Sequence, residues 1–496
     1  MAKANYIRHP NPMHRGNPLV EGLGFPLAKQ QIHTQCGVSF VDGLDLTGVP
    51  DELHGYYTRS SILNLFSLHV VQDEMVEIYE AIRLGIEVSY LGRNPLNDDW
   101  QGILAAIEAD KDAPLKSLNI RRLNLLENSY TFLISGLSGR GKSSMVKQAL
   151  EQIEQKIEHT AYPMSGDGTQ KPCQLTQITY VYVEHHDRVG QKAFLTAILD
   201  AIDEATGEQY AYKQRNSSVY ELIQTVRKAV VKHHIGALII DEAQNFAPSS
   251  SDFKIGTNEK TSMKFVEELV NTLGVSTIFV GTFSALELFA KEMTITRRTL
   301  RAGSLNLASC DVESGFWKNL CYALFNSVRF SAARDSDEVL RYKLHDLTAG
   351  IPAIAVSVVQ ATLRFLSYFE ASKQTLTASA LDHVFLKQFS PLSGPIAALH
   401  SMRNGSDYKA YEDLKPMRLL EMVNPKNAHH DVEKLKAVEG KAKQMMQEYE
   451  RDNAKLLRGK VQVIPHKPPR TAYEVDASQE SDKMSPDNFL SMLGED

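Results

Sequence analysis

Short apolar runs alternate along the chain with longer stretches in which apolar residues recur at helical spacing. Helical spacing predicts helices near residues 142–158, 190–205, 217–233 and 261–273. Strands that alternate with helices predict an α/β fold whose parallel sheet has right-handed crossovers. The runs that indicate buried strands are Tyr130–Ser135, Thr179–Glu184, Ala237–Asp241, Val275–Gly281 and a shorter fifth, Ser304–Ser309.

The pattern changes on both sides of this region. Residues 1–60 are rich in Pro, Gly, His and Asn and have no sustained period, which predicts an N-terminal arm with short helical pieces. We assign this arm to partner contacts. Helical patterning begins the core, which we place at residues 61–310, and a helical lid follows at residues 311–415.

Beyond the lid, residues 416–460 are charged and low in aromatic residues, and a thin apolar stripe predicts a charged helical extension. Residues 461–496 hold three basic and seven acidic residues, and also four prolines. That composition predicts a flexible acidic tail, disordered over most of its length. Its last part, Ser485–Gly494, has the pattern of a short amphipathic helix that would order on docking to a partner.

Composition restricts the class of protein. Of 496 residues, 43% are hydrophobic and 23% charged, which is typical of a soluble globular protein. The four cysteines are scattered, which argues against a zinc site or a disulfide framework. We find no apolar run of about 18 residues and no secretory signal, so we expect a cytoplasmic protein with no membrane partner. Because the net charge is −6, contact with nucleic acid requires a local basic surface.

A phosphate-binding loop follows the first predicted strand, because residues 136–143 fit the pattern G-x-x-x-x-G-K-[ST]. The glycines let backbone N–H groups approach phosphates, and a helix that starts at Lys142 directs its positive end at the same anion. The Lys142 ammonium can neutralise the β- and γ-phosphates, and the Ser143 hydroxyl can ligate Mg²⁺. We expect ATP to contact Gly136, Ser138, Gly139, Arg140, Gly141, Lys142, Ser143 and Ser144.

An acidic pair ends the Ala237–Asp241 run, which we place beside the strand that precedes the phosphate loop. Asp241 can hold Mg²⁺ through water, and Glu242 can orient or deprotonate an attacking water. The alternative for Asp241 is a solvated carboxylate at a strand end. For Glu242, it is that the base is another residue, because many proteins with a phosphate loop lack this glutamate.

Three further residues are predicted to act on the γ-phosphate. Thr282 follows the Val275–Gly281 run, where a polar side chain can contact the γ-phosphate or the attacking water. Arg297 and Arg298 precede the fifth strand, and a guanidinium can stabilise charge on the transferred phosphoryl group, often from a neighbouring subunit. The alternatives are a loop hydroxyl at Thr282 and a solvated basic turn at the arginines.

The order of these motifs resembles AAA+ ATPases of the initiator branch. Within that branch, residues 15–415 resemble the TnsC family, the ATPase regulators of Tn-seven-type transposons, including CRISPR-associated ones. The resemblance departs at Phe283, where we expect proline. It is carried by LGRNP at residues 91–95, by GALIIDEAQNF, STIFVGTFSALELF and RRTLRAG, and by two lid blocks that begin LTAGIPAIAV and LTASALDHVF.

The resemblance implies a switch that uses ATP and Mg²⁺. TnsC-type ATPases form rings or filaments on double-stranded DNA without sequence preference. They receive a signal from a target selector of the TnsD, TnsE or TniQ type, and they recruit the transposase TnsB with TnsA. ATP hydrolysis permits disassembly. The sequence does not choose among the target-selection routes.

Two sets of contacts follow from the same resemblance. In AAA+ proteins the segment before the core often lines the adenine pocket, which suggests Tyr90 and Arg93; a turn within the core is the alternative. For the DNA backbone we expect basic residues near a central pore, each of which could instead be a solvated charge. These are Arg188, Lys192, Lys213, Arg215 and Lys254, with Lys260 and Lys264 as further positions.

Two other functions stay open. A nucleotide-gated scaffold with negligible hydrolysis would need Lys142 and Asp241 but not Glu242. A replication initiator or helicase loader of the same branch would carry similar motifs, although no winged-helix block is recognisable after the lid.

Overall fold

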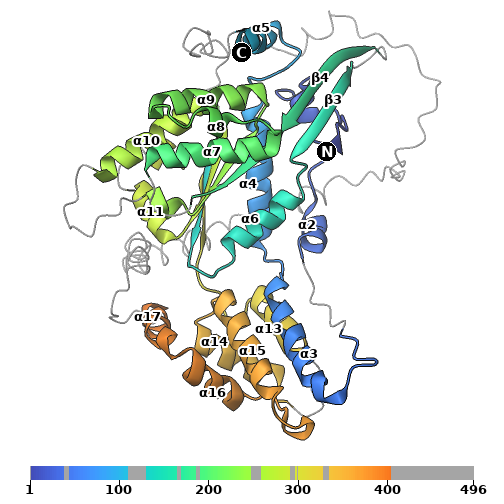
Figure 1. Cartoon of the computed structure of the whole chain (residues 1–496), viewed down its shortest axis with the longest axis vertical. Coiled ribbons are helices and arrows are strands. Elements are labelled where there is room, and N and C mark those ends of the chain that lie inside the picture. The colour runs from blue at the N-terminus through green and yellow to red at the C-terminus, as the bar shows by residue number, and fades with distance from the viewer. Residues whose placement is uncertain are drawn as a thin grey trace, which may run out of the picture. The chain divides into compact units, whose positions relative to one another are not determined.

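A five-stranded parallel sheet forms the centre of the fold in a computed structural model of the chain (Figure 1). The predicted α/β class and all five predicted strands are confirmed. In spatial order the strands are β5 (Tyr180–Glu184), β6 (Ala237–Asp241), β7 (Ser276–Gly281), β2 (Thr131–Gly136) and β8 (Ser304–Leu307). The structure describes residues 2–37, 44–109, 130–164, 169–185, 190–246, 258–290, 296–298, 300–327 and 334–403.

The strand order corrects one expectation. Strand β6, which ends in Asp241, does not lie beside β2, because β7 separates the two. Apolar runs identify the strands, but their order depends on where each crossover helix packs. The acidic pair is therefore one strand further from the phosphate loop than predicted.

Helices cover both faces of the sheet, so alternate residues of each strand are buried on opposite sides (Figure 1). In β6, Leu238 and Ile240 pack with one layer, and Ala237 and Ile239 pack with the other. Burial on both faces explains why β6 is a continuous apolar run. One layer contains α7 (Gln191–Thr206), α9 (Val219–Lys232), α10 (Asn258–Leu273) and α11 (Phe283–Ala290); the other contains α4 (Glu74–Ser89) and α6 (Lys142–Glu151).

A β-hairpin stands where we predicted the end of a helix. Helix α6 ends at Glu151, and β3 (Lys156–Pro163) pairs antiparallel with β4 (Gln170–Ile178). Strand β1 (Ala2–Lys3) adds to β3 in parallel. The sequence carried a signal that we missed, because Ile157 and His159 alternate with exposed residues and the strands flank an SGDG turn sequence.

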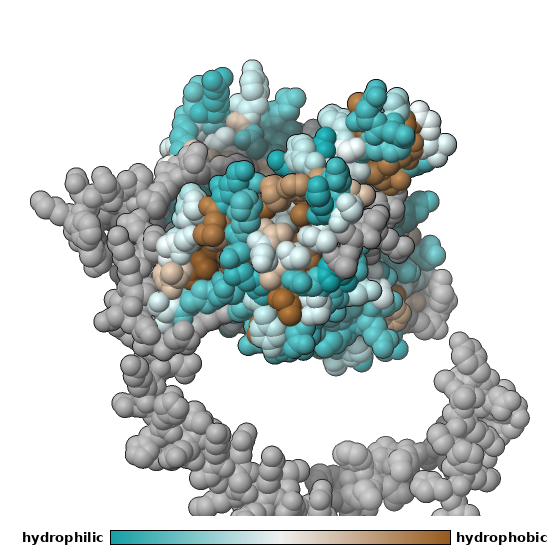
Figure 2. All heavy atoms as spheres, turned by 90° about the horizontal axis from the view of Figure 1, so that it is seen from below, coloured by the Kyte–Doolittle hydropathy of each residue, from teal (hydrophilic) through white to brown (hydrophobic). Residues whose placement is uncertain are grey.

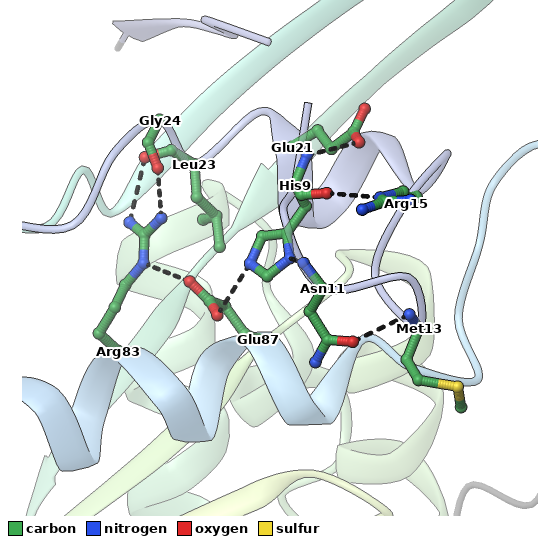
Figure 3. A network of polar contacts seen from close by, with 9 residues as sticks. All are labelled: His9, Asn11, Met13, Arg15, Glu21, Leu23, Gly24, Arg83 and Glu87. Carbon is green, nitrogen blue, oxygen red and sulfur yellow. Dashed lines mark hydrogen bonds and ion pairs between the residues drawn. The ribbon is translucent and has the colours of Figure 1, made fainter. Parts of the chain in front are cut away.

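Much of the N-terminal arm packs against the core. Leu19 in α1 (Pro18–Glu21) and Ile32 in α2 (Lys29–Gln35) are fully buried in the cluster that includes α4. Figure 3 shows polar contacts that fix the arm. The Arg83 guanidinium donates to Glu87 at 2.9 Å and to the carbonyls of residues 23 and 24, while a carboxylate oxygen of residue 21 accepts from the backbone N–H of residue 9 at 2.9 Å.

In the described part of the chain after residue 311, five α-helices pack in the region predicted as a lid, and α3 (Asp51–Leu63), which we assigned to the arm, packs with them. The Gln360 side chain donates to the carbonyls of Ile62 and Leu63, and Ile62 is buried in the lid cluster. The boundary at residue 60 is therefore wrong, because it cuts this helix. The lid helices are α13 (Gly315–Phe325), α14 (Asp337–Thr348), α15 (Pro352–Leu366), α16 (Ala378–Gln388) and α17 (Ser393–Arg403).

Phe283, the position where proline was expected, connects the core to the lid. It begins α11 and is buried in the lid cluster together with Leu137 of the phosphate loop. The backbone bond from the N–H of Ala285 to the carbonyl of Thr282, at 3.0 Å, closes the first turn without proline.

Two further α-helices are α5 (Asp98–Ala109), beside α9, and α8 (Tyr210–Lys213), beside α7. From the lid end, hydrophobic side chains form separate groups among hydrophilic ones (Figure 2). No single described helix is long and apolar enough to cross a membrane; α14 and α15 pass that test only as a pair bent by 118°. The predicted charged extension at residues 416–460 and the tail at residues 461–496 lie outside the described residues.

Candidate functional site

A cavity of about 520 Å³ lies at the carboxyl ends of β6 and β7, between the phosphate loop and lid residues. Its volume is in the range of small-molecule binding sites. The cavity brings together most of the residues predicted from the sequence: Ser138, Gly139, Arg140, Gly141, Lys142, Ser143, Ser144, Asp241, Glu242 and Thr282.

The phosphate loop has the backbone that its glycines predict. Gly139 and Gly141 have φ values of +77° and +93°, a conformation that favours glycine, and Gly141 is the N-cap of α6. Gly136 does not line the cavity. A Cβ atom at Gly136 would lie 2.4 Å from the carbonyl oxygen of Leu307, so this glycine allows β2 and β8 to approach.

Lys142 is buried among the loop carbonyls. Its Nζ donates to the carbonyls of Gly136 at 3.1 Å and Leu137 at 2.9 Å. Burial lowers the pKa of Lys142 to about 8, and the nearby charges of Asp241 and Glu242 oppose this shift. The ammonium is thus close to both acidic residues and poorly solvated, which favours binding of an anion.

The Arg140 side chain anchors the phosphate loop to residues that lie outside the loop. Its guanidinium donates to the carbonyl of Ala308 at 2.7 Å, pairs with Glu74 at 3.2 Å and donates to Gln72. The lid also holds the loop, because the backbone N–H of Ala353 donates to the carbonyl of Gly139 at 3.1 Å. The predicted ATP contact at Arg140 therefore comes from a side chain that is already paired within the chain.

Asp241 is held by two donors. The Tyr182 hydroxyl donates to one carboxylate oxygen at 2.6 Å, and the backbone N–H of Glu242 donates to the other at 2.8 Å. Burial and the Asp241 carboxylate raise the pKa of Tyr182, which keeps this hydroxyl a donor. Asp241 and Ser143 line the same cavity, and their oxygens are of the type that Mg²⁺ prefers.

Glu242 has a backbone conformation that is uncommon for a residue other than glycine, with φ of +58°. Such conformations cluster at functional sites. The Gln244 side chain donates to the Glu242 carboxylate, and the backbone N–H of Thr282 donates to Gln244 at 2.9 Å. These contacts join the acidic pair to the end of β7.

Tyr90 and Arg93 do not line the cavity, which corrects their predicted place in an adenine pocket. The Tyr90 hydroxyl donates to the carbonyl of His234 at 2.8 Å, and Arg93 donates to the carbonyls of Ile235 at 2.7 Å and Gly274 at 3.2 Å. These carbonyls precede β6 and β7, so both side chains lie at the amino ends of these strands, whereas the cavity lies at their carboxyl ends. The alternative interpretation, a turn within the core, is the one that the structure supports.

A different segment before the core reaches the cavity. Sequence reasoning missed it, because the helical pattern was extended from α4 back to Ser67. A signal was present in the apolar residues that end at Val71, two residues before Asp73 and just ahead of the amphipathic helix α4. The residues of this segment that line the cavity are Phe66, Leu68, His69, Val70 and Gln72.

The two predicted arginines lie away from their own cavity. Arg298 pairs with Glu267 of α10, and its carbonyl accepts a hydrogen bond from the hydroxyl of Thr131, the first residue of β2. Arg297 is exposed. Because the phosphate loop follows the other end of β2, neither arginine can serve the site of its own chain.

Two of the described basic residues predicted to contact DNA, Lys192 and Lys213, lie near opposite ends of α7. Lys192 lies in the first turn of α7, near Glu221, whereas Lys213 lies in α8, which is bonded to Asp203 near the last turn of α7. A helix of this length spans about 24 Å. Lys192, Lys213, Arg215 and Lys264 are exposed, while Arg188, Lys254 and the side chain of Lys260 lie outside the described residues.

Comparisons with known proteins give a match to one family model and similarity to solved structures. Residues 126–289 match the model of the AAA domain family. No curated protein matches the chain. Two solved structures of the ORC2 protein from Aeropyrum pernix, one in ADPNP–ADP complexes and one in the ADP form, are each 13% identical to the chain. They cover 57% and 58% of this chain and 71% and 72% of theirs, with TM-scores of 0.34 and 0.32.

The parallel sheet, the phosphate loop after β2 and the acidic pair at the end of β6 define a P-loop nucleotide-binding domain. Residues 126–289, which include the phosphate loop and the acidic pair, are the part of the chain that matches the AAA domain family.

Proposed function

We propose that this protein is an ATP-hydrolysing switch that assembles on duplex DNA and regulates transposition, as its resemblance to the TnsC family implies. One observation carries the enzymatic part of the proposal. Lys142, Asp241 and Glu242 line one cavity, which also contains Ser143 and Thr282. A site for nucleotide binding alone would not need a glutamate beside the metal-binding aspartate.

Each side chain has a distinct task in this proposal. Lys142 binds the β- and γ-phosphates, and the N-terminus of α6 adds its positive end. Ser143 and Asp241 hold Mg²⁺, which offsets phosphate charge. Glu242 accepts a proton from the attacking water, and Thr282 orients that water or the γ-phosphate. The apolar residues of the segment between α3 and α4 contact the adenine base of ATP.

The cavity needs another positive charge. Among the described residues that line it, the lid contributes no cationic side chain, and Arg140 is already paired with Glu74. We assign the missing charge to Arg297 of a neighbouring subunit, because Arg297 is exposed and Arg298 is paired with Glu267. A γ-phosphate at such an interface would favour assembly only while it is present.

DNA binding and partner contacts extend the proposal to the whole protein. Subunits assembled on DNA would contact its phosphates with the exposed basic residues of α7, the α8 region and α10. The target selector and the transposase TnsB with TnsA are then the partners that give and receive the signal. We propose the terminal segment Ser485–Gly494 as the contact with the transposase, and the N-terminal arm as a further region for partner contacts.

Assembly on duplex DNA tests this function. We expect the wild-type protein to form large complexes with DNA when ATP is present, and to lose them as salt rises, because released counterions oppose binding. Glu242→Gln should keep the complexes assembled, Lys142→Ala should prevent them, and Arg297→Ala should bind ATP but assemble poorly. Mass photometry with two DNA sequences, with ATP, ADP or no nucleotide, measures this.

Assembly by Lys142→Ala, or equal assembly without nucleotide, would contradict the switch. A strong preference for one DNA sequence in the absence of partners would contradict contacts limited to the backbone. Nucleotide-dependent assembly without any ATP turnover would favour the scaffold, and loading of a helicase would favour the initiator alternative.

A further inference from the structure

Gln244 occupies an unusual place in the site. It lies in the short 3₁₀ helix Ala243–Phe246 that directly follows the acidic pair. Both the nitrogen and the oxygen of its side-chain amide form hydrogen bonds. The amide NH₂ donates to the Glu242 carboxylate, and the amide oxygen accepts from the backbone N–H of Thr282 at 2.9 Å. Only a side chain that both donates and accepts can make these two bonds.

The strand order explains why the two hydrogen bonds of Gln244 matter for the position of Glu242. Glu242 follows β6, and β7 separates β6 from β2, the strand that leads into the phosphate loop. Glu242 and the phosphate loop are therefore not on neighbouring strands. Thr282 follows β7, which pairs directly with β2. The Gln244 amide links the Glu242 carboxylate to the strand that does pair with β2.

The backbone at Gly281 and Glu242 leaves room for the Gln244 side chain between them. A Cβ atom at Gly281 would lie 2.8 Å from the Gln244 amide oxygen, so a larger residue there would displace the amide. On the other side, the left-handed backbone of Glu242 is tied to Asp241, whose carboxylate accepts from its N–H at 2.8 Å. The Tyr182 hydroxyl completes a continuous path of hydrogen bonds across the ends of β5, β6 and β7.

We propose that Gln244 is a positioning residue that sets the place of the Glu242 carboxylate relative to the phosphate loop by bonding it to the backbone of Thr282. The inference rests on the proposed role of Glu242 as the base in ATP hydrolysis. Gln244 acts through Glu242 and transfers no proton itself.

Three substitutions at Gln244 separate the two bonds. Gln244→Met keeps the length of the side chain and removes both. Gln244→Glu keeps an acceptor for Thr282 but places a carboxylate, which cannot donate, against Glu242. Gln244→Asn keeps both polar groups on a chain shorter by one methylene. Asn245→Ala is the matched control, because it removes an amide from the same 3₁₀ helix that, among the described residues, donates to the carbonyl of His185 at 2.7 Å and not to the acidic pair.

The experiment measures ATP turnover at saturating Mg²⁺ and ATP, together with the Kd for ATP and the melting temperature, on the full chain with duplex DNA. We expect Gln244→Met and Gln244→Glu to lower kcat about tenfold or more, a part of the total effect of a general base. Gln244→Asn should fall between them and wild type. The Kd for ATP should stay within about twofold in all variants, and Asn245→Ala should match the wild type.

A double-mutant cycle distinguishes positioning from a separate contact. In the Glu242→Gln background, Gln244→Met should cause no further loss of kcat, because the carboxylate that it positions is already gone. Wild-type turnover in Gln244→Met, or an equal fractional loss in both backgrounds, would overturn the proposal. If Gln244→Met fails to fold, Gln244→Asn and Gln244→Glu carry the same cycle. Unchanged turnover in Glu242→Gln alone would instead refute the proposed base.

Discussion

At the residue scale, the burial of Lys142 ties nucleotide binding to pH. Its ammonium is surrounded by loop carbonyls, and burial lowers its pKa to about 8. Below that pH the residue is charged and can pair with phosphate. Above it the free protein holds a neutral amine, so binding of ATP must first take up a proton.

We therefore predict that ATP affinity falls as pH rises from about 8 towards 10, by up to about tenfold per pH unit. The Kd measured by titration with a fluorescent ATP analogue, in the absence of DNA, provides the test. Lys142→Arg is the matched control, because arginine stays charged over this range and its Kd should change little. A Kd of the wild type that does not change with pH over this range would contradict the lowered pKa of the buried Lys142.

The residues that could be predicted at this scale are those with local chemical patterns. The phosphate loop and the Asp241–Glu242 pair form motifs whose spacing defines their function, and both reach the cavity. Gln244 stands in the same motif, but its role depends on Thr282, which is distant in sequence. The segment between α3 and α4 was missed, because its apolar side chains were assigned to the helical pattern that continues in α4.

At the element scale, the LGRNP segment holds elements together rather than binding nucleotide. The arm is fixed to this segment and to the residue before it, because Asn94 donates to the carbonyl of Gly16 at 2.9 Å and Asn17 donates to the carbonyl of Tyr90 at 2.8 Å. Arg93, which is 1% exposed, bonds the carbonyls that precede β6 and β7. The sequence alone does not predict whether this segment lies at the amino ends or at the carboxyl ends of the strands.

We predict that Arg93→Met destabilises the protein by about 3 kcal/mol or more, because several buried carbonyls lose their donor. The ATP affinity of the folded protein should not change. Thermal unfolding and the Kd for ATP, measured on the same samples, separate the two effects, and Arg215→Met is a control at an exposed arginine. A loss of ATP affinity without a loss of stability would restore Arg93 to the nucleotide site.

Periodicity accounts for most elements, and its failures have physical causes. The helices of the lid were predicted because each has one buried face. The β3–β4 hairpin was missed because α6 precedes it closely and its alternation is short, with a buried tyrosine shifted by a bulge after His159. Helix α3 was assigned to the arm because the residues that cover it, in α15, come about 300 positions later.

At the scale of the whole molecule, the order of strands decides how the site is assembled. Apolar runs give the number of strands, but β7 lies between β6 and β2 because the helix after β6 returns the chain to that position. The lid and the phosphate loop also meet through bonds between distant residues, such as Ala353 and Gly139. These relations depend on packing of complete helices, which no local pattern contains.

The central claim is that this AAA domain hydrolyses ATP with Glu242 as the base. Steady-state release of phosphate from Mg²⁺–ATP, by wild type and Glu242→Gln side by side with and without duplex DNA, tests it most directly. The account predicts turnover in the wild type and a loss of about a hundredfold or more in Glu242→Gln, with the Kd for ATP unchanged. Equal turnover in the two proteins, or no turnover by wild-type protein that binds ATP, would contradict it.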